Sequence, residues 1–147
     1  MPLLVDYSLL FLNKSWEWLN DPEIQLLTLT PPFTKQDQVN FYDSLPNKKD
    51  YWIKGNMENG HPIGAMGLKH ITSNEAEYWG YIGERDYWGK GIGSFMLKEA
   101  TTKAKEFGLQ KIYLKVGKQN TRAKQLYSRL GFQIVLTGAI EKYEMNL

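Results

Sequence analysis

The spacing of apolar residues predicts alternating strands and helices along most of the chain. Between residues 92 and 107 apolar side chains recur at helical intervals, and Gly108 stands where such a helix would end. A second helical stretch covers 121–130. The segments 77–83, 112–116, 132–136 and 140–145 have the short, apolar composition of strands.

The first seventy residues contain prolines, capping residues and short apolar runs. The runs 3–5 and 9–12 could form a first strand, and Asn13 could cap a short helix after it. Further helices are expected to begin at Asp21-Pro22-Glu23 and at Thr34-Lys35-Gln36-Asp37. Strands at 51–53 and 63–68 follow, joined across residues 58–62. This order predicts an α/β (α+β) sandwich around one mixed sheet, in a single domain over residues 1–147.

Composition and charge narrow the class of protein. With 147 residues, of which 42% are hydrophobic, the chain suits one full core. It has no cysteine, which excludes disulfides and thiol catalysis, and neither His61 nor His70 has a second ligand at metal spacing, so no metal is expected. A net charge of +2 without a basic run argues against a nucleic-acid partner. With no long apolar run and no signal peptide, we expect no membrane partner and a cytoplasmic monomer or homodimer.

The segment 87–94, Tyr-Trp-Gly-Lys-Gly-Ile-Gly-Ser, carries the most specific chemical signal. Its three alternating glycines let a ligand approach the backbone closely, and the helix that follows offers unpaired N–H groups and a positive dipole end. This pattern predicts a pyrophosphate cradle. It is not a P-loop, because Lys90 is followed by Gly91, and only about fifty residues remain for a dinucleotide fold.

A second motif runs without a break from Asn120 to Phe132 and fits the pattern N-x-x-A/S-x-x-L-Y-x-x-x-G-F. Together with the glycine segment it resembles the GNAT superfamily of acyl-CoA N-acyltransferases, whose pyrophosphate loop reads Q/R-x-x-G-x-G/A. The resemblance covers residues 75–132. Trp88 replaces the usual Gln or Arg. Because such a loop works mainly through backbone N–H groups, we expect CoA binding to survive this change.

The resemblance implies acetyl-CoA as the co-substrate and a central sheet, mixed but mostly antiparallel, flanked by helices. In the superfamily the fourth and fifth strands splay apart. The pantetheine arm of CoA would pair with the end of the fourth strand, and the phosphates would lie on the loop. On these grounds the residues expected to bind the cofactor are Ile82, Gly83, Glu84, Gly89, Lys90, Gly91, Ile92, Gly93, Ser94 and Asn120. Asn120 could instead only cap its helix.

Direct attack of an amine on a thioester needs proton transfers but no covalent enzyme intermediate, so the lack of a catalytic cysteine fits this chemistry. The resemblance places Tyr127 beside the CoA sulfur, as a general acid. Glu77 is the candidate base, because alternation along a strand puts it on one face with Trp79 and Tyr81. Glu75 is its rival, and an ordered water chain is a third alternative.

The acceptor is expected to be a primary amine on a small polar molecule, with a nucleotide-linked amino sugar as first choice. Aromatic side chains can stack on a base or cover a sugar face. Those available in the N-terminal half and the fourth strand are Trp16, Trp18, Phe33, Tyr42, Tyr51, Trp52 and Trp79. The segments 18–24 and 81–84 also resemble two branches of the superfamily, which act on nucleotide-linked amino sugars and on N-termini of ribosomal proteins. The alternatives are therefore a protein or peptide N-terminal acetyltransferase and a non-catalytic acyl-CoA-binding module.

Overall fold

A computed structural model describes residues 1–147 and shows one seven-stranded sheet of order β1-β2-β3-β4-β5-β7-β6. The strands are β1 (Pro2–Asp6), β2 (Trp52–Glu58), β3 (His61–Lys69), β4 (Glu75–Ile82), β5 (Lys111–Gly117), β6 (Gln133–Leu136) and β7 (Ile140–Asn146). The helices are α1 (Leu9–Trp18), α2 (Pro22–Leu27), α3 (Lys35–Ser44), α4 (Ile92–Glu106) and α5 (Thr121–Arg129), with short 3-10 turns η1 (Leu45–Asn47) and η2 (Arg85–Tyr87). None of the helices is long and apolar enough to cross a membrane.

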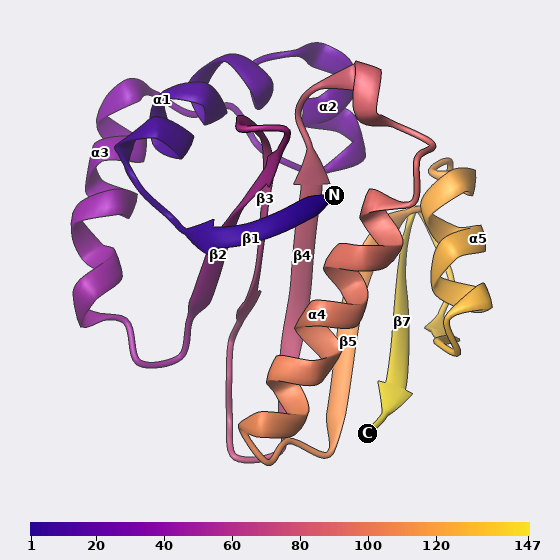
Figure 1. The fold of residues 1–147 in the computed structure, drawn as a ribbon. Helices are drawn as coiled ribbons and strands as arrows, with labels where there is room; N and C mark the ends of the chain where they lie inside the picture. The colour runs from indigo at the N-terminus through magenta and orange to yellow at the C-terminus, as the bar shows by residue number, and fades with distance from the viewer.

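The sheet is covered on both faces, and the alternation of side chains along β4 shows how. Gly80 lies against Met96 of α4, whereas the next residue, Tyr81, packs edge-on against Trp18 of α1, with ring centroids 6.1 Å apart. Neighbouring residues of a strand point to opposite faces, so α4 and α1 lie on opposite sides of the sheet. Figure 1 shows α4 across β4 and β5, with α5 beside β7. The predicted sandwich is thus confirmed.

The strands β4 and β5 are the only parallel neighbours, and they pair over just three residues. Glu75, Ala76 and Glu77 are in register with residues 111–113, while every other neighbouring pair is antiparallel. Beyond this register, β4 continues to Ile82 and β5 to Gly117 without pairing with each other. The predicted separation of the fourth and fifth strands is therefore present, and it leaves one backbone edge of β4 free.

The start of the chain differs from the sequence-based expectation. Residues 9–12 belong to α1 and not to a strand, and Asn13 lies inside this helix instead of capping one. The helix buries Phe11, Leu12, Ser15 and Trp18, whose spacing of one, three and three residues gives one helical face. A four-residue apolar run is too short to separate strand from helix by periodicity, and the long-range packing of this face decides it.

Two other local capping signals, at Asp21 and Thr34, predicted helix starts correctly. Asp21 accepts hydrogen bonds from the N–H groups of Glu23 and Ile24 at 3.0 and 3.3 Å, and so caps α2. Thr34 and Asp37 cap each other's backbone N–H at the start of α3, in a capping box. These bonds need only neighbouring residues, so the sequence contains all the information for them.

Candidate active site

A cleft of about 1240 Å³ opens where β4 and β5 separate. Its floor is formed by residues 77–82 of β4 and 114–116 of β5. One side is lined by the first turns of α4 and by α5, and the other by α1, α2, α3 and the loop between α2 and α3. The cleft is therefore bordered by helices from both halves of the chain.

The glycine segment forms one end of the cleft. Gly89 and Gly91 have φ angles of +75° and +82°, a conformation that favours glycine, although a side chain would have free space at either position. Gly91 precedes the first residue of α4, and no side chain caps this helix. The first N–H groups of α4 thus lack helical partners and point out of the helix start. This geometry fits an anionic group such as a pyrophosphate.

Hydrogen bonds hold the end of β4 to β3 and to Trp88. The N–H groups of Gly83 and Glu84 both donate to the carbonyl of Ile63 in β3, at 2.7 and 3.3 Å. The carbonyl of Ile82 accepts a hydrogen bond from the indole Nε1 of Trp88 at 2.8 Å. The N–H groups of Gly83 and Glu84 are therefore directed to β3 and away from the cleft.

Tyr127 lies on α5 and lines the cleft. Its ring packs between Phe132 and Tyr143, with centroid distances of 6.1 and 6.0 Å. Burial raises the pKa of Tyr127 to about 12, because a phenolate would lose its hydration there. The side chain is thus a neutral proton donor throughout the physiological range.

Glu77 lies at the point where β4 and β5 part. It is in register with Tyr113 of β5, is only 7% exposed, and lines the cleft. The ammonium of Lys69 lies 3.8 Å from its carboxylate. Glu75 is on the same strand face but does not line the cleft. Of the two candidate bases, Glu77 is therefore the one that a ligand in the cleft can reach.

A row of aromatic rings forms the wall on the α1–α3 side. Tyr51, Trp79 and Tyr81 follow one another with centroid distances of 6.2 and 6.4 Å. Burial raises the pKa of both tyrosines well above the usual value, so they are uncharged. The indole Nε1 of Trp79 is buried and has no hydrogen-bond partner. This wall can stack on a flat ring, while the buried Nε1 lies against Gly67 of β3.

A model of the acetyltransferase (GNAT) family matches residues 13–132, a range that contains the glycine segment, both candidate catalytic residues and the motif ending at Phe132. The chain belongs to this family. GCN5-related N-acetyltransferase 6, chloroplastic, of Arabidopsis thaliana is 29% identical to it over 98 residues, which are 64% of this chain. The chain spans between 25% and 36% of the lengths of the curated relatives that it matches.

Solved structures repeat the fold over nearly the whole chain. A domain from Methanocaldococcus jannaschii has a TM-score of 0.86 and 21% identity, covering 100% of this chain and 99% of its own. The spermidine N-acetyltransferase of Vibrio cholerae, solved in complex with CoA and spermine, has a TM-score of 0.87 and 19% identity, covering 99% and 95%. At these identities the likeness shows the GNAT fold and does not identify a substrate.

Within this GNAT domain, the predicted cofactor residues divide into two groups. Those that line the cleft are Ile82, Gly89, Gly91, Gly93, Ser94 and Asn120. Those that do not are Gly83, Glu84, Lys90 and Ile92. In the second group Gly83 is buried against the ring of Trp18, and Ile92 belongs to the core. In the first, Asn120 accepts a hydrogen bond from the N–H of Ala123 at 3.3 Å and thus caps α5, the alternative left open by the sequence.

Only some of the aromatic residues considered for acceptor binding line the cleft. Phe33, Tyr51 and Trp79 line the cleft, whereas Trp16, Trp18, Tyr42 and Trp52 do not. Sequence reasoning overlooked Lys69, whose pairing with Glu77 follows from the register of β3 and β4, and Tyr7, which packs in the cleft near Phe41. Alternation along β4 had already placed Tyr81 on one face with Glu77 and Trp79, and all three line the cleft. No local signal identifies Lys69, because strand register is set by the whole sheet.

Proposed function

We propose that this GNAT domain transfers an acetyl group from acetyl-CoA to a primary amine on a small polar molecule. One observation carries the proposal: a single cleft joins the uncapped start of α4 to Tyr127, Glu77 and the aromatic wall. The residues present fit a pyrophosphate at one end and an uncharged ring at the other. The CoA bound to the spermidine N-acetyltransferase of the same fold supports this reading.

The roles of the chain's own residues follow from their positions. When bound, acetyl-CoA supplies a thioester whose carbonyl carbon can accept an amine. Glu77 takes the amine proton, directly or through a water, as the C–N bond forms. Tyr127 donates its phenolic proton toward the sulfur as the C–S bond breaks, and water then reprotonates it. The products are an amide and a thiol, and no covalent bond to the protein is needed.

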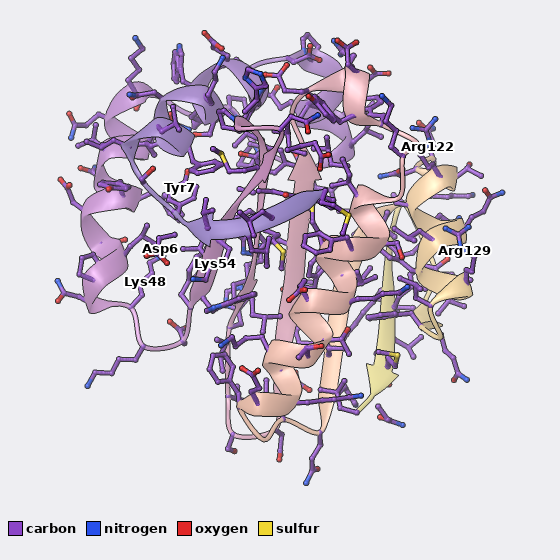
Figure 2. The ribbon with its side chains drawn as sticks, viewed as in Figure 1. Asp6, Tyr7, Lys48, Lys54, Arg122 and Arg129 are labelled. Carbon is purple, nitrogen blue, oxygen red and sulfur yellow. The ribbon has the colours of Figure 1, made fainter.

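The charges of the cleft favour an acceptor that carries phosphate over a polyamine. All three acidic residues that line it already have partners: Glu23 pairs with Arg85 at 3.0 Å, Asp37 accepts from the N–H of Thr34 at 2.8 Å, and Glu77 faces Lys69 at 3.8 Å. Basic side chains in the lining include Lys69, Lys115, Arg122 and Arg129, of which the two arginines project from α5 (Figure 2). A cleft with engaged acids and surplus bases attracts anions.

The acceptor that best suits this cleft is an amino sugar linked to a nucleotide. Its base or sugar ring would stack on the row formed by Tyr51, Trp79 and Tyr81, and the surplus positive charge of the cleft would attract its phosphates. A protein N-terminus would instead need an open groove for an extended chain. The neutral, stacked rings thus favour a compact flat ring.

Side-by-side turnover measurements test the proposal. With acetyl-CoA present, thiol release is followed for nucleotide-linked amino sugars, polyamines and N-terminal peptides. We expect the amino sugars to be acetylated fastest, and Trp79→Ala to raise KM for the amine but not for acetyl-CoA. Trp52→Ala is the matched control, because Trp52 lies outside the cleft. Turnover of peptides alone would favour an N-terminal acetyltransferase, and acetyl-CoA binding without any turnover would favour a non-catalytic module.

A further inference from the structure

Trp88 stands at the position where the family pattern has Gln or Arg, and its side chain makes a specific contact. The indole Nε1 donates to the carbonyl of Ile82, the last residue of β4, at 2.8 Å. This carbonyl lies in the part of β4 that has no pairing with β5. The bond therefore closes the chain between the strand end and the glycine segment into a fixed loop, and Trp88 itself lines the cleft.

A second contact holds the indole from its other side. The guanidinium of Arg85 lies 5.6 Å from the centre of the Trp88 ring, within the range of a cation–π interaction. Arg85 is in turn fixed at the start of α2 by Asp21 and Glu23, at 2.6 and 3.0 Å. The ring is thus held between α2 and β4, and so is the backbone that leads directly into Gly89 and Gly91.

We infer that Trp88 is a positioning residue for acetyl-CoA, because it sets the spacing between the glycine segment and the end of β4. This inference rests on the proposed use of acetyl-CoA. The pyrophosphate and the pantetheine arm are parts of one ligand, so they bind well together only if their two subsites keep the right separation. Binding energy from one end of a ligand helps the other end only when the geometry admits both at once. Trp88 supplies that geometry through the hydrogen bond to Ile82.

The test compares a whole ligand with its nucleotide half. Acetyl-CoA contains both the pyrophosphate and the arm, whereas adenosine 3′-phosphate 5′-diphosphate contains only the former. Trp88→Phe keeps a ring beneath Arg85 but removes the N–H donor. Since one hydrogen bond has a modest net value, we expect acetyl-CoA to bind about three- to tenfold more weakly to this variant, and the half-ligand to keep its Kd within about twofold. The KM for the amine should not change.

Two further variants keep the test decisive. Trp88→Leu also removes the indole donor and keeps an apolar side chain, so it should shift the ratio of the two affinities in the same direction if Trp88→Phe fails to fold. Trp52→Phe, the control outside the cleft, should leave both affinities unchanged. Equal weakening of both ligands, or no weakening, in the Trp88 variants would show a packing role and overturn the inference alone. Failure of the wild type to bind either ligand would overturn the proposed function as well.

Discussion

Replacing Gly91 with Asp tests the anion site at the start of α4 most directly. Gly91 has a φ of +82°, and a new side chain would meet no atom within 4 Å. Any residue other than glycine is strained there, by roughly 1–3 kcal/mol. Asp also adds a negative charge beside the first N–H groups of the helix. An acidic group is normally favourable at a helix start, so lost ligand binding could not be attributed to fraying of α4.

The size of the effect follows from charge repulsion. Two unit charges about 4 Å apart repel by about 1 kcal/mol in bulk water and by about 4 kcal/mol near a protein surface. These limits correspond to a loss of acetyl-CoA affinity of roughly fivefold to several hundredfold. A ligand at about a hundredfold its Kd stabilises the native state by about 2.7 kcal/mol, which for a domain of this size raises Tm by roughly 5–11 °C. For Gly91→Asp this rise should shrink by at least about 2–4 °C.

Thermal unfolding with and without acetyl-CoA measures this shift. Gly91→Ala is the matched control, because it carries the same backbone strain without the charge. Both variants should have a lower Tm than the wild type when no ligand is present, and only the Asp variant should lose about a third or more of its ligand-induced rise. If acetyl-CoA stabilises the wild type and Gly91→Asp equally, the pyrophosphate does not lie at the start of α4.

Three other outcomes are expected. Tyr127→Phe should lower kcat by about 10²-fold or more with little change in the Kd of acetyl-CoA; an unchanged kcat, with chemistry rate-limiting, would leave Tyr127 a packing role. Glu77→Gln should reduce the rate most near neutral pH, whereas Glu75→Gln, outside the cleft, should not; the reverse pattern would identify Glu75 as the base. Burial raises the pKa of Tyr51 and Tyr127 above the value of about 10 in an unfolded chain, so stability is fully present below about pH 10 and is lost as the pH rises through about 12. Chemical denaturation across this range measures the loss, and a constant free energy of unfolding would contradict it.

The parts of the fold that the sequence predicted correctly depend on neighbouring residues. The caps at Asp21 and Thr34 are bonds within one helical turn, and Gly108 ends α4 with a φ of +76°. The family motifs added the separation of β4 and β5, which no periodicity predicts. The error at residues 9–12 has the opposite origin: Phe11 packs where Gly55 of β2 has no side chain, a contact between residues far apart in sequence.

In the candidate site, too, features set by neighbouring residues were predictable, whereas features set by long-range packing were not. The backbone conformation of the glycine segment was predictable, because glycine favours the positive φ angles that Gly89 and Gly91 adopt. Which aromatic residues line the cleft was not predictable, because the position of an aromatic side chain depends on the element that packs over it. From residue type alone, Trp18 and Trp79 were equally good candidates for contacting the acceptor. In the structure Trp18 packs against Gly83, whereas Trp79 lines the cleft. The bond from Trp88 to Ile82 likewise depends on how far β4 extends past its pairing with β5.

In the proposed reaction, the raised pKa of Tyr127 restricts how it can help the departing sulfur. An ordinary thiol has a pKa of about 8.5, so transferring a proton from a phenol with a pKa of about 12 to a hydrated thiolate is uphill by roughly 5 kcal/mol. The transfer becomes balanced only if the thiolate is also poorly hydrated, since burial raises its pKa as it raises that of Tyr127. A dry cleft therefore lets Tyr127 give up its proton, whereas a water-filled one limits it to donating a hydrogen bond. The aromatic wall and an acceptor that fills the cleft beside Glu77 are what would exclude that water, so the acid chemistry of Tyr127 depends on the acceptor being bound.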